Sequence, residues 1–132
     1  MRILLDTNVI ISALLFGGKP RIIVSSVIRK EHIAITSTIL LSELADVLRK
    51  KFGYSQSAAN AVDVQIRKQC IIVSPNEMID VVADMPDNRV LEAAVEGKCE
   101  CIITGDTDLL SLRNYRNIRI LTPDEFFQET AD

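Results

Sequence analysis

The sequence contains no tryptophan and a single histidine, and aromatic residues make up only 5% of its 132 positions. The hydrophobic core must therefore be built from Ile, Val and Leu. With His32 as the only imidazole beside three cysteines, a structural zinc site is not expected. Cys99 and Cys101 are too close in sequence to close a loop, so we expect both of them, together with Cys70, to be buried free thiols.

Long apolar runs are also missing. The longest, such as residues 13–16, are far too short to cross a bilayer. Asp6 interrupts the apolar start of the chain, and no small-residue cleavage site follows it, as a signal peptide would require. We therefore expect a cytoplasmic protein with no membrane association.

The chain has no excess of positive charge. Its 15 Lys and Arg residues against 18 Asp and Glu residues give a net charge of −3, which provides no general attraction to nucleic acid. Local attraction remains open, because basic residues gather at positions 29–30, 49–51, 67–68 and 113–119. Solvated helix ends explain such groups more often than RNA contacts do.

What the sequence does contain is a regular alternation of short apolar runs with helical patterns. This alternation predicts one α/β domain over residues 1–132, a three-layer α/β/α fold with a central parallel sheet of about five strands. The expected strands are Arg2–Leu5, Ile33–Ile35, Cys70–Val73, Cys101–Thr104 and Ile118–Leu121. The expected helices cover 7–16, 20–30, 38–52, 55–69, 88–96 and 109–112, with a last helix from 123 and a short helix or turn over 76–83.

Two acidic residues stand directly after expected strands. Asp6 follows the first strand, and Asp106 follows the fourth, with Asp108 two residues further on. In open α/β sheets, ligands bind outside the carboxyl ends of the strands, where the strand order reverses. If the first and fourth strands are neighbours, Asp6 and Asp106 approach each other at that edge. Each also has a structural interpretation, because aspartate is a favourable helix N-cap.

Two further acids belong to helices that lead to the same edge. Glu43 lies on the flank of the apolar stripe of the helix over 38–52, so it is either directed toward the sheet or partly exposed. Asp87 precedes the helix over 88–96, where it could also serve as an N-cap, and Asp84 is a rival for its role.

Four carboxylates at one edge repel each other, raise each other's pKa and destabilise the fold unless a cation is present. Mg²⁺ and Mn²⁺ prefer carboxylate and water oxygens and leave coordination positions for phosphate. A metal held in this way activates water and neutralises charge on a phosphoryl oxygen. The cluster therefore indicates phosphate-ester chemistry.

The order of these motifs resembles the PIN-domain family, and most closely the VapC-like toxin ribonucleases of toxin–antitoxin systems. The likeness rests on "DTN" at residues 6–8, Glu43 in a leucine-rich helix, "DNRVLEAA" from Asp87, and "TGD" at 104–106, and it spans residues 2–127. The resemblance implies a PIN-like fold and an endoribonuclease that uses Mg²⁺ or Mn²⁺ to activate the water that attacks an RNA phosphodiester bond.

The resemblance also assigns roles to residues. The catalytic and metal-binding acids would be Asp6, Glu43, Asp87 and Asp106, while Asn8, Thr104 and Asp108 would support them. It further implies a small antitoxin protein as a partner and a homodimer or higher homo-oligomer.

Two other functions remain open. A haloacid-dehalogenase-like phosphohydrolase needs an acid two residues after its aspartate nucleophile, but Asn8 cannot donate a proton as a carboxylic acid does. The Asp106–Asp108 pair has the right spacing but follows a late strand, and no lysine remains downstream to hold a phosphoryl group. The third possibility is a non-catalytic module that binds RNA or protein; the loss of an acid would be its signature, and none is lost.

Overall fold

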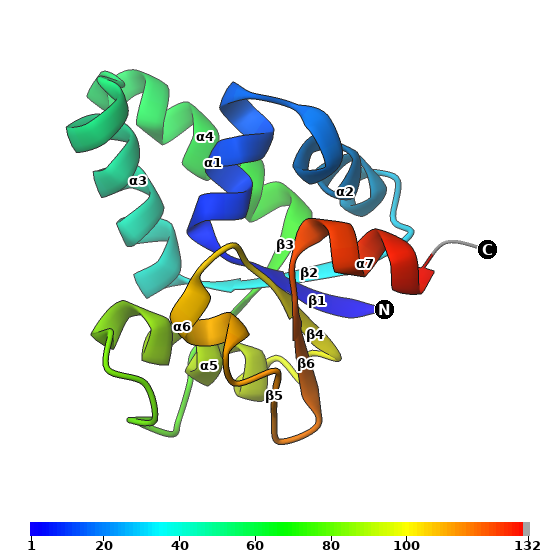
Figure 1. Ribbon diagram of the computed structural model, residues 1–132. Coiled ribbons are helices and arrows are strands. Elements are labelled where there is room, and N and C mark those ends of the chain that lie inside the picture. The colour runs from blue at the N-terminus through cyan, green and yellow to red at the C-terminus, as the bar shows by residue number, and fades with distance from the viewer. Residues whose placement is uncertain (131–132) are drawn as a thin grey trace.

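The computed structural model describes residues 1–130 and contains one six-stranded sheet with helices on both faces (Figure 1). Its strands are arranged in the order β3-β2-β1-β4-β6-β5. Five of them pair in parallel, as the sequence predicts: β1 (Arg2–Leu5), β2 (Ile33–Ser37), β3 (Cys70–Val73), β4 (Cys101–Ile103) and β6 (Ile118–Leu121).

Seven helices are seen in the described residues. They are α1 (Thr7–Leu15), α2 (Gly18–Ile28), α3 (Thr38–Phe52), α4 (Gln56–Gln69), α5 (Met85–Glu96), α6 (Thr107–Leu110) and α7 (Pro123–Thr130). α1, α2 and α7 cover one face of the sheet, and α5 and α6 cover the other (Figure 1). α3 and α4 pack against each other beside α1, so the expected three-layer α/β/α architecture is confirmed.

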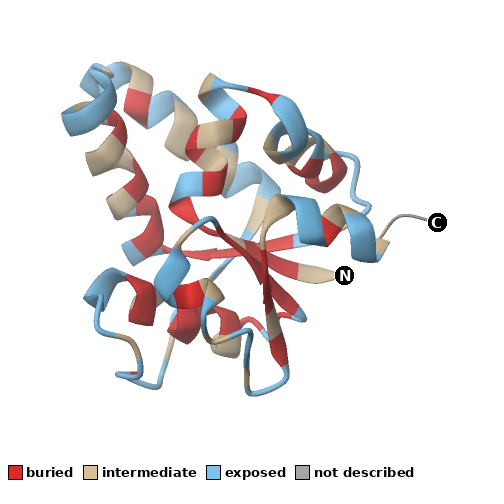
Figure 2. Cartoon of the chain, viewed as in Figure 1, coloured by how far each residue is buried: buried red, intermediate tan, exposed pale blue. Residues whose placement is uncertain are grey.

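The central strands are buried on both faces (Figure 2). In β1, Ile3 packs with α1, α2 and α7, while Leu4 packs with α5 and α6. Successive strand residues face opposite sides, so a strand covered by helices on both sides must be apolar throughout. This requirement explains the short uninterrupted apolar runs that mark the strands in the sequence.

Local signals place the ends of α3 close to the expected positions. Ser37 caps its start by accepting a hydrogen bond from the N–H of Leu40 at 3.2 Å. Gly53 ends it in the left-handed conformation, with φ of 69°, which a residue without Cβ adopts at little cost. The helix axis is therefore fixed at both ends, and with it the position of Glu43.

Two elements differ from the sequence prediction. A sixth strand, β5 (Asn114–Tyr115), pairs antiparallel with β6 through a turn in which Arg116 and Asn117 both have positive φ. Turns with positive φ at both central residues favour Asn, Asp and Gly, and here only Asn117 matches that preference, so the turn had little signal in the sequence. Of the two structures expected over 76–83, a short helix or a turn, the helix is not formed.

The second difference concerns α5, which begins at Met85 rather than Asn88 and includes Asp87 in its first turn. Pro86 fits this early start, because proline is tolerated in the first turn, where its missing N–H has no intrahelical partner. The expectation that Asp87 is the N-cap is thus wrong: Asp84 occupies that position.

Half of the basic residues in the clusters, all of them arginines, form surface ion pairs. The paired residues are Arg29 with Glu31, Arg49 with Asp46, Arg67 with Asp63, Arg116 with Glu77 and Arg119 with Glu129. These pairs support the interpretation of the clusters as solvated helix and strand ends, and they identify no path for RNA.

The cysteines are free, with Cys99 and Cys101 buried and Cys70 half-buried. Within residues 1–130, no helix by itself is long and apolar enough to cross a membrane; α1 and α2 reach those criteria only as a pair, bent by 102° at their junction.

Candidate active site

The strand order reverses between β1 and β4, which pair in parallel with β2 and β6 on their outer sides. Asp6 follows β1 and Asp106 follows β4 after two intervening residues, so both lie at the carboxyl edge of this central pair. The sequence-based expectation that the first and fourth strands are neighbours is confirmed. This is the position at which open parallel sheets bind ligands.

Asp6 is 5% exposed and serves as the N-cap of α1. One carboxylate oxygen, Oδ1, accepts the N–H of Thr7 at 2.8 Å, and the other accepts the hydroxyl of Thr104 at 2.8 Å. Burial raises the pKa of Asp6, these hydrogen bonds lower it, and the negative charge of Asp106 raises it further. Its net pKa lies above the ordinary value of 3.8.

Thr104 and Asn8 join the two strand ends. Thr104 is fully buried, and its hydroxyl accepts the N–H of Asp106 at 2.9 Å while it donates to Asp6. Asn8 donates to Oδ2 of Asp6 at 3.3 Å and accepts the N–H of Gly105 at 3.0 Å. Both side chains therefore link the chain after β1 to the chain after β4.

Asp84, Asp87 and Asp106 form a tighter group, in which one carboxylate oxygen from each residue lies within 4.8 Å of the others. Asp87 is 6% exposed, and its Oδ2 atom is buried without a hydrogen-bond partner. Burial, followed by the adjacent carboxyl of Asp106, raises the pKa of Asp87 well above its usual range. A cation would supply the positive charge that this oxygen lacks, so the donor set suits a metal that prefers oxygen.

Glu43 approaches the site from α3 and is half-buried. Burial raises its pKa from 4.5 to about 6, and the charges of Asp6 and Asp84 contribute to this rise. Asp108 is exposed in α6; its backbone N–H donates to Oδ1 of Asp106 at 2.8 Å, so that Asp106 caps this helix. Of the four predicted acids, only Asp87 and Asp106 belong to the tight group with Asp84, while Asp6 and Glu43 lie near enough for their charges to act on it.

Asp84 and Asp87, rivals by sequence alone, both belong to the group. Two buried polar residues of α5 were not expected: Asn88 and Glu92, which are 0% and 7% exposed. Their signal was present in "DNRVLEAA", where the two are four positions apart and therefore lie on the same face of the helix.

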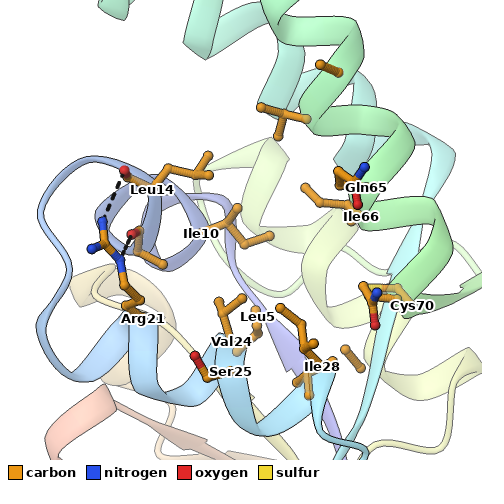
Figure 3. A pocket seen from close by; sticks show the side chains of 16 residues that line it. Leu5, Ile10, Leu14, Arg21, Val24, Ser25, Ile28, Gln65, Ile66 and Cys70 are labelled. Carbon is orange, nitrogen blue, oxygen red and sulfur yellow. Dashed lines mark hydrogen bonds between the residues drawn. The ribbon is translucent and has the colours of Figure 1, made fainter.

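A second feature, distinct from the acids, is a mainly apolar hollow of about 530 Å³ between α1, α2 and α4 (Figure 3). Ile10, Val24, Ile28 and Ile66 are among the residues that line it, and Arg21 at its margin donates to backbone carbonyls of α1. No carboxylate lines this hollow, so it is separate from the acidic group.

The fold and the acids together define a class: an α/β domain that carries carboxylates at the switch point of a mainly parallel sheet. The sequence profile of the PIN domain matches residues 2–108. An uncharacterized protein of Methanocaldococcus jannaschii, MJ1680, is 32% identical over 143 aligned positions, which cover 98% of this chain and 91% of that protein. The chain therefore belongs to the PIN-domain family, a family of nucleases.

Solved structures share the fold. VapBC-1 from nontypeable Haemophilus influenzae is similar over 94% of this chain and 99% of that one, with a TM-score of 0.64 and 17% identity. The structure of VapBC2 from Rickettsia felis bound to a promoter DNA fragment is similar over 91% of this chain and 97% of that one, with a TM-score of 0.62 and 13% identity. FitAcB from Neisseria gonorrhoeae is similar over 92% of this chain and 97% of that one, with a TM-score of 0.55 and 16% identity.

Proposed function

We propose that this protein is a metal-dependent endoribonuclease of the cytoplasm that hydrolyses RNA phosphodiester bonds with Mg²⁺ or Mn²⁺. The observation that supports this most is the group of Asp84, Asp87 and Asp106 at the switch point of the sheet, where Asp87 has a buried oxygen without a partner. The charge of the neighbouring Asp6 also acts on Asp87. Burying an unpaired carboxylate costs several kcal/mol, roughly, or forces the group to take up a proton. Such an arrangement is retained where a cation is to be bound.

Different residues of the chain would bind the cation and position its ligands. Asp6, Asp87, Asp106 and Glu43 would hold the cation, with Thr104 keeping Asp6 in place by its hydrogen bond. When bound, the metal would lower the pKa of the attacking water and neutralise charge that develops on the phosphoryl oxygens.

The test is cleavage of single-stranded RNA by the purified protein. We expect cleavage with Mn²⁺ or Mg²⁺, none in EDTA, and none from the Asp6→Asn variant, because its amide keeps the shape of the side chain but removes the charge. The matched control is Asp63→Asn on α4, which removes a surface acid paired with Arg67 and should leave cleavage unchanged. Full cleavage in EDTA or by Asp6→Asn would refute the metal mechanism.

The phosphatase alternative is disfavoured by the contacts of Asn8. Its amide lies between Asp6 and the N–H of Gly105, so it supplies a hydrogen-bond donor and an acceptor but no transferable proton. Release of phosphate from small phosphomonoesters, with RNA left intact, would reverse this preference. Binding of RNA without cleavage at any metal concentration would indicate the non-catalytic alternative.

We further propose that the protein is the toxin of a toxin–antitoxin pair, as its likeness to VapC-like toxins implies, and that it forms a homodimer or higher homo-oligomer.

The apolar hollow of Figure 3 is the surface we assign to apolar side chains of the antitoxin, encoded in the neighbouring reading frame. Ile28→Asp, in the hollow, should abolish co-purification with that small protein. Ile22→Asp is the control, because Ile22 is similarly exposed on the same helix but outside the hollow. Equal retention by both variants would refute this assignment.

A further inference from the structure

Asp84 occupies the N-cap position of α5 without capping it. Its side chain accepts no cap hydrogen bond, whereas Asp6 and Asp106, at the N-caps of α1 and α6, both accept backbone N–H groups. Aspartate is favoured at this position because its carboxylate satisfies one of the free N–H groups of the first turn. The carboxylate of Asp84 does not serve that purpose, so its placement needs another explanation.

The carboxylate lies against the acids of the site instead. One of its oxygens is within 4.8 Å of oxygens from Asp87 and Asp106. Asp87 contributes the buried Oδ2 atom that no hydrogen-bond donor reaches. Three carboxylates at this separation repel one another, and an unpartnered buried oxygen among them is the arrangement that a cation would complete.

The loop before α5 is held so that Asp84 remains in this place. Asn88, fully buried in α5, accepts the N–H groups of Val81 and Val82 at 3.0 and 3.1 Å and donates to the carbonyl of Val82 at 2.9 Å. One turn later, Glu92 accepts the N–H of Ile79 at 2.8 Å. These bonds attach the backbone over 79–82 to the helix, immediately before Asp84.

We propose that Asp84 is a direct ligand of the divalent cation together with Asp87 and Asp106, and that Asn88 is the positioning residue that presents it. This inference rests on the proposed metal-dependent function and extends it by one ligand and one supporting side chain. Asp84 at the N-cap and Asp87 in the first turn of α5 are then partners instead of alternatives for one role.

The experiment is a calorimetric titration of the metal-free protein with Mn²⁺, with water-proton relaxation as a second measure of bound metal. We expect Asp84→Asn to weaken Mn²⁺ affinity by at least about 10-fold, because even the loss of a group that only orients a ligand typically costs about 10- to 100-fold. Asp80→Asn is the matched control, since Asp80 is an exposed acid of the same loop outside the group. Its affinity should equal that of the wild type.

A charge can also act on a metal through space, and salt separates the two effects. Raising KCl from about 0.15 M to about 0.5 M shortens the screening length from about 8 Å to about 4–5 Å, so a through-space effect shrinks while the loss of a ligand persists. Wild-type affinity in Asp84→Asn, or a deficit that disappears in high salt, would overturn the proposal. Absence of Mn²⁺ binding by the wild type would instead refute the proposed function itself, so the two failures are distinguishable.

Discussion

Replacement of Glu43 by glutamine should stabilise the metal-free protein at about pH 7.5. In the folded protein, burial and the charges of Asp6 and Asp84 raise the pKa of Glu43 from 4.5 to about 6. A carboxyl group whose pKa is higher in the folded than in the unfolded protein lowers the free energy of unfolding at every pH at which the group is ionised. The difference between 4.5 and about 6 corresponds to about 2 kcal/mol. Because Glu43 is only half-buried, solvent screening reduces this to about 1 kcal/mol.

The dependence on pH has a definite sign. Between pH 4.5 and about 6, the folded state binds more protons at Glu43 than the unfolded state does. The contribution of Glu43 to the free energy of unfolding therefore falls as the pH rises through this window, and the full penalty remains above it. Glu43→Gln should gain stability at about pH 7.5 and lose that gain below about pH 4.5.

The assay is thermal unfolding of the metal-free protein, followed by circular dichroism across this pH range. For a chain of 132 residues, about 1 kcal/mol raises the unfolding midpoint by about 3–4 °C. With saturating Mn²⁺ the order should reverse, because the wild type then gains more stability from the bound ion.

The control for Glu43→Gln is Asp46→Asn on the same helix, which removes a surface acid paired with Arg49. Exposed pairs of this kind contribute about 0–1 kcal/mol, so this variant should show no gain in stability. A lower midpoint for metal-free Glu43→Gln at about pH 7.5, or a gain that persists unchanged below pH 4.5, would refute the reasoning that the site is strained by its charges.

Three further outcomes are expected. Thr104→Val should weaken Mn²⁺ affinity about 10-fold in calorimetry, because Asp6 loses the hydroxyl that holds it, and Thr104→Ser should restore the affinity. Gly97→Ala should lower the free energy of unfolding by about 1–3 kcal/mol in urea denaturation, since its new Cβ would lie 2.4 Å from Cγ2 of Ile35; an unchanged midpoint would contradict this contact. Because burial raises the pKa of Cys101 to about 12, this thiol should resist iodoacetamide at about pH 8 in the folded protein and react after unfolding, as mass spectrometry would detect.

The fold was largely predictable because its strands are buried on both faces. A strand such as β1 must be apolar throughout, and the residue that ends it, Asp6, is conspicuous for that reason. The hairpin of β5 and β6 lacked such a signal, because β5 has only two residues. Its turn also requires positive φ at Arg116 and Asn117, which cannot be predicted from an arginine followed by an asparagine.

The site was predictable to the extent that it depends on strand order. Asp6 and Asp106 could be placed together once their strands were assumed to be neighbours, since the edge of a parallel sheet is a property of its topology. The start of α5 could not be located as closely, because Asp84 and Asp87 are both acceptable near a helix N-terminus. The hydrogen bonds of Asn88 hold the preceding loop against α5, and these form only in the folded chain.

The acids of the site are not equally prepared to carry charge. Asp6 accepts hydrogen bonds from Thr104, from Asn8 and from the backbone, and these bonds oppose the effect of burial on its pKa. Asp87 has an oxygen with no donor and faces the carboxyl of Asp106, so its charge is the least compensated. A protein optimised for stability alone would not keep such a group, and a binding site retains it at a cost to the fold. The proton that a bound cation displaces at neutral pH should therefore come mainly from Asp87, which links metal affinity to pH.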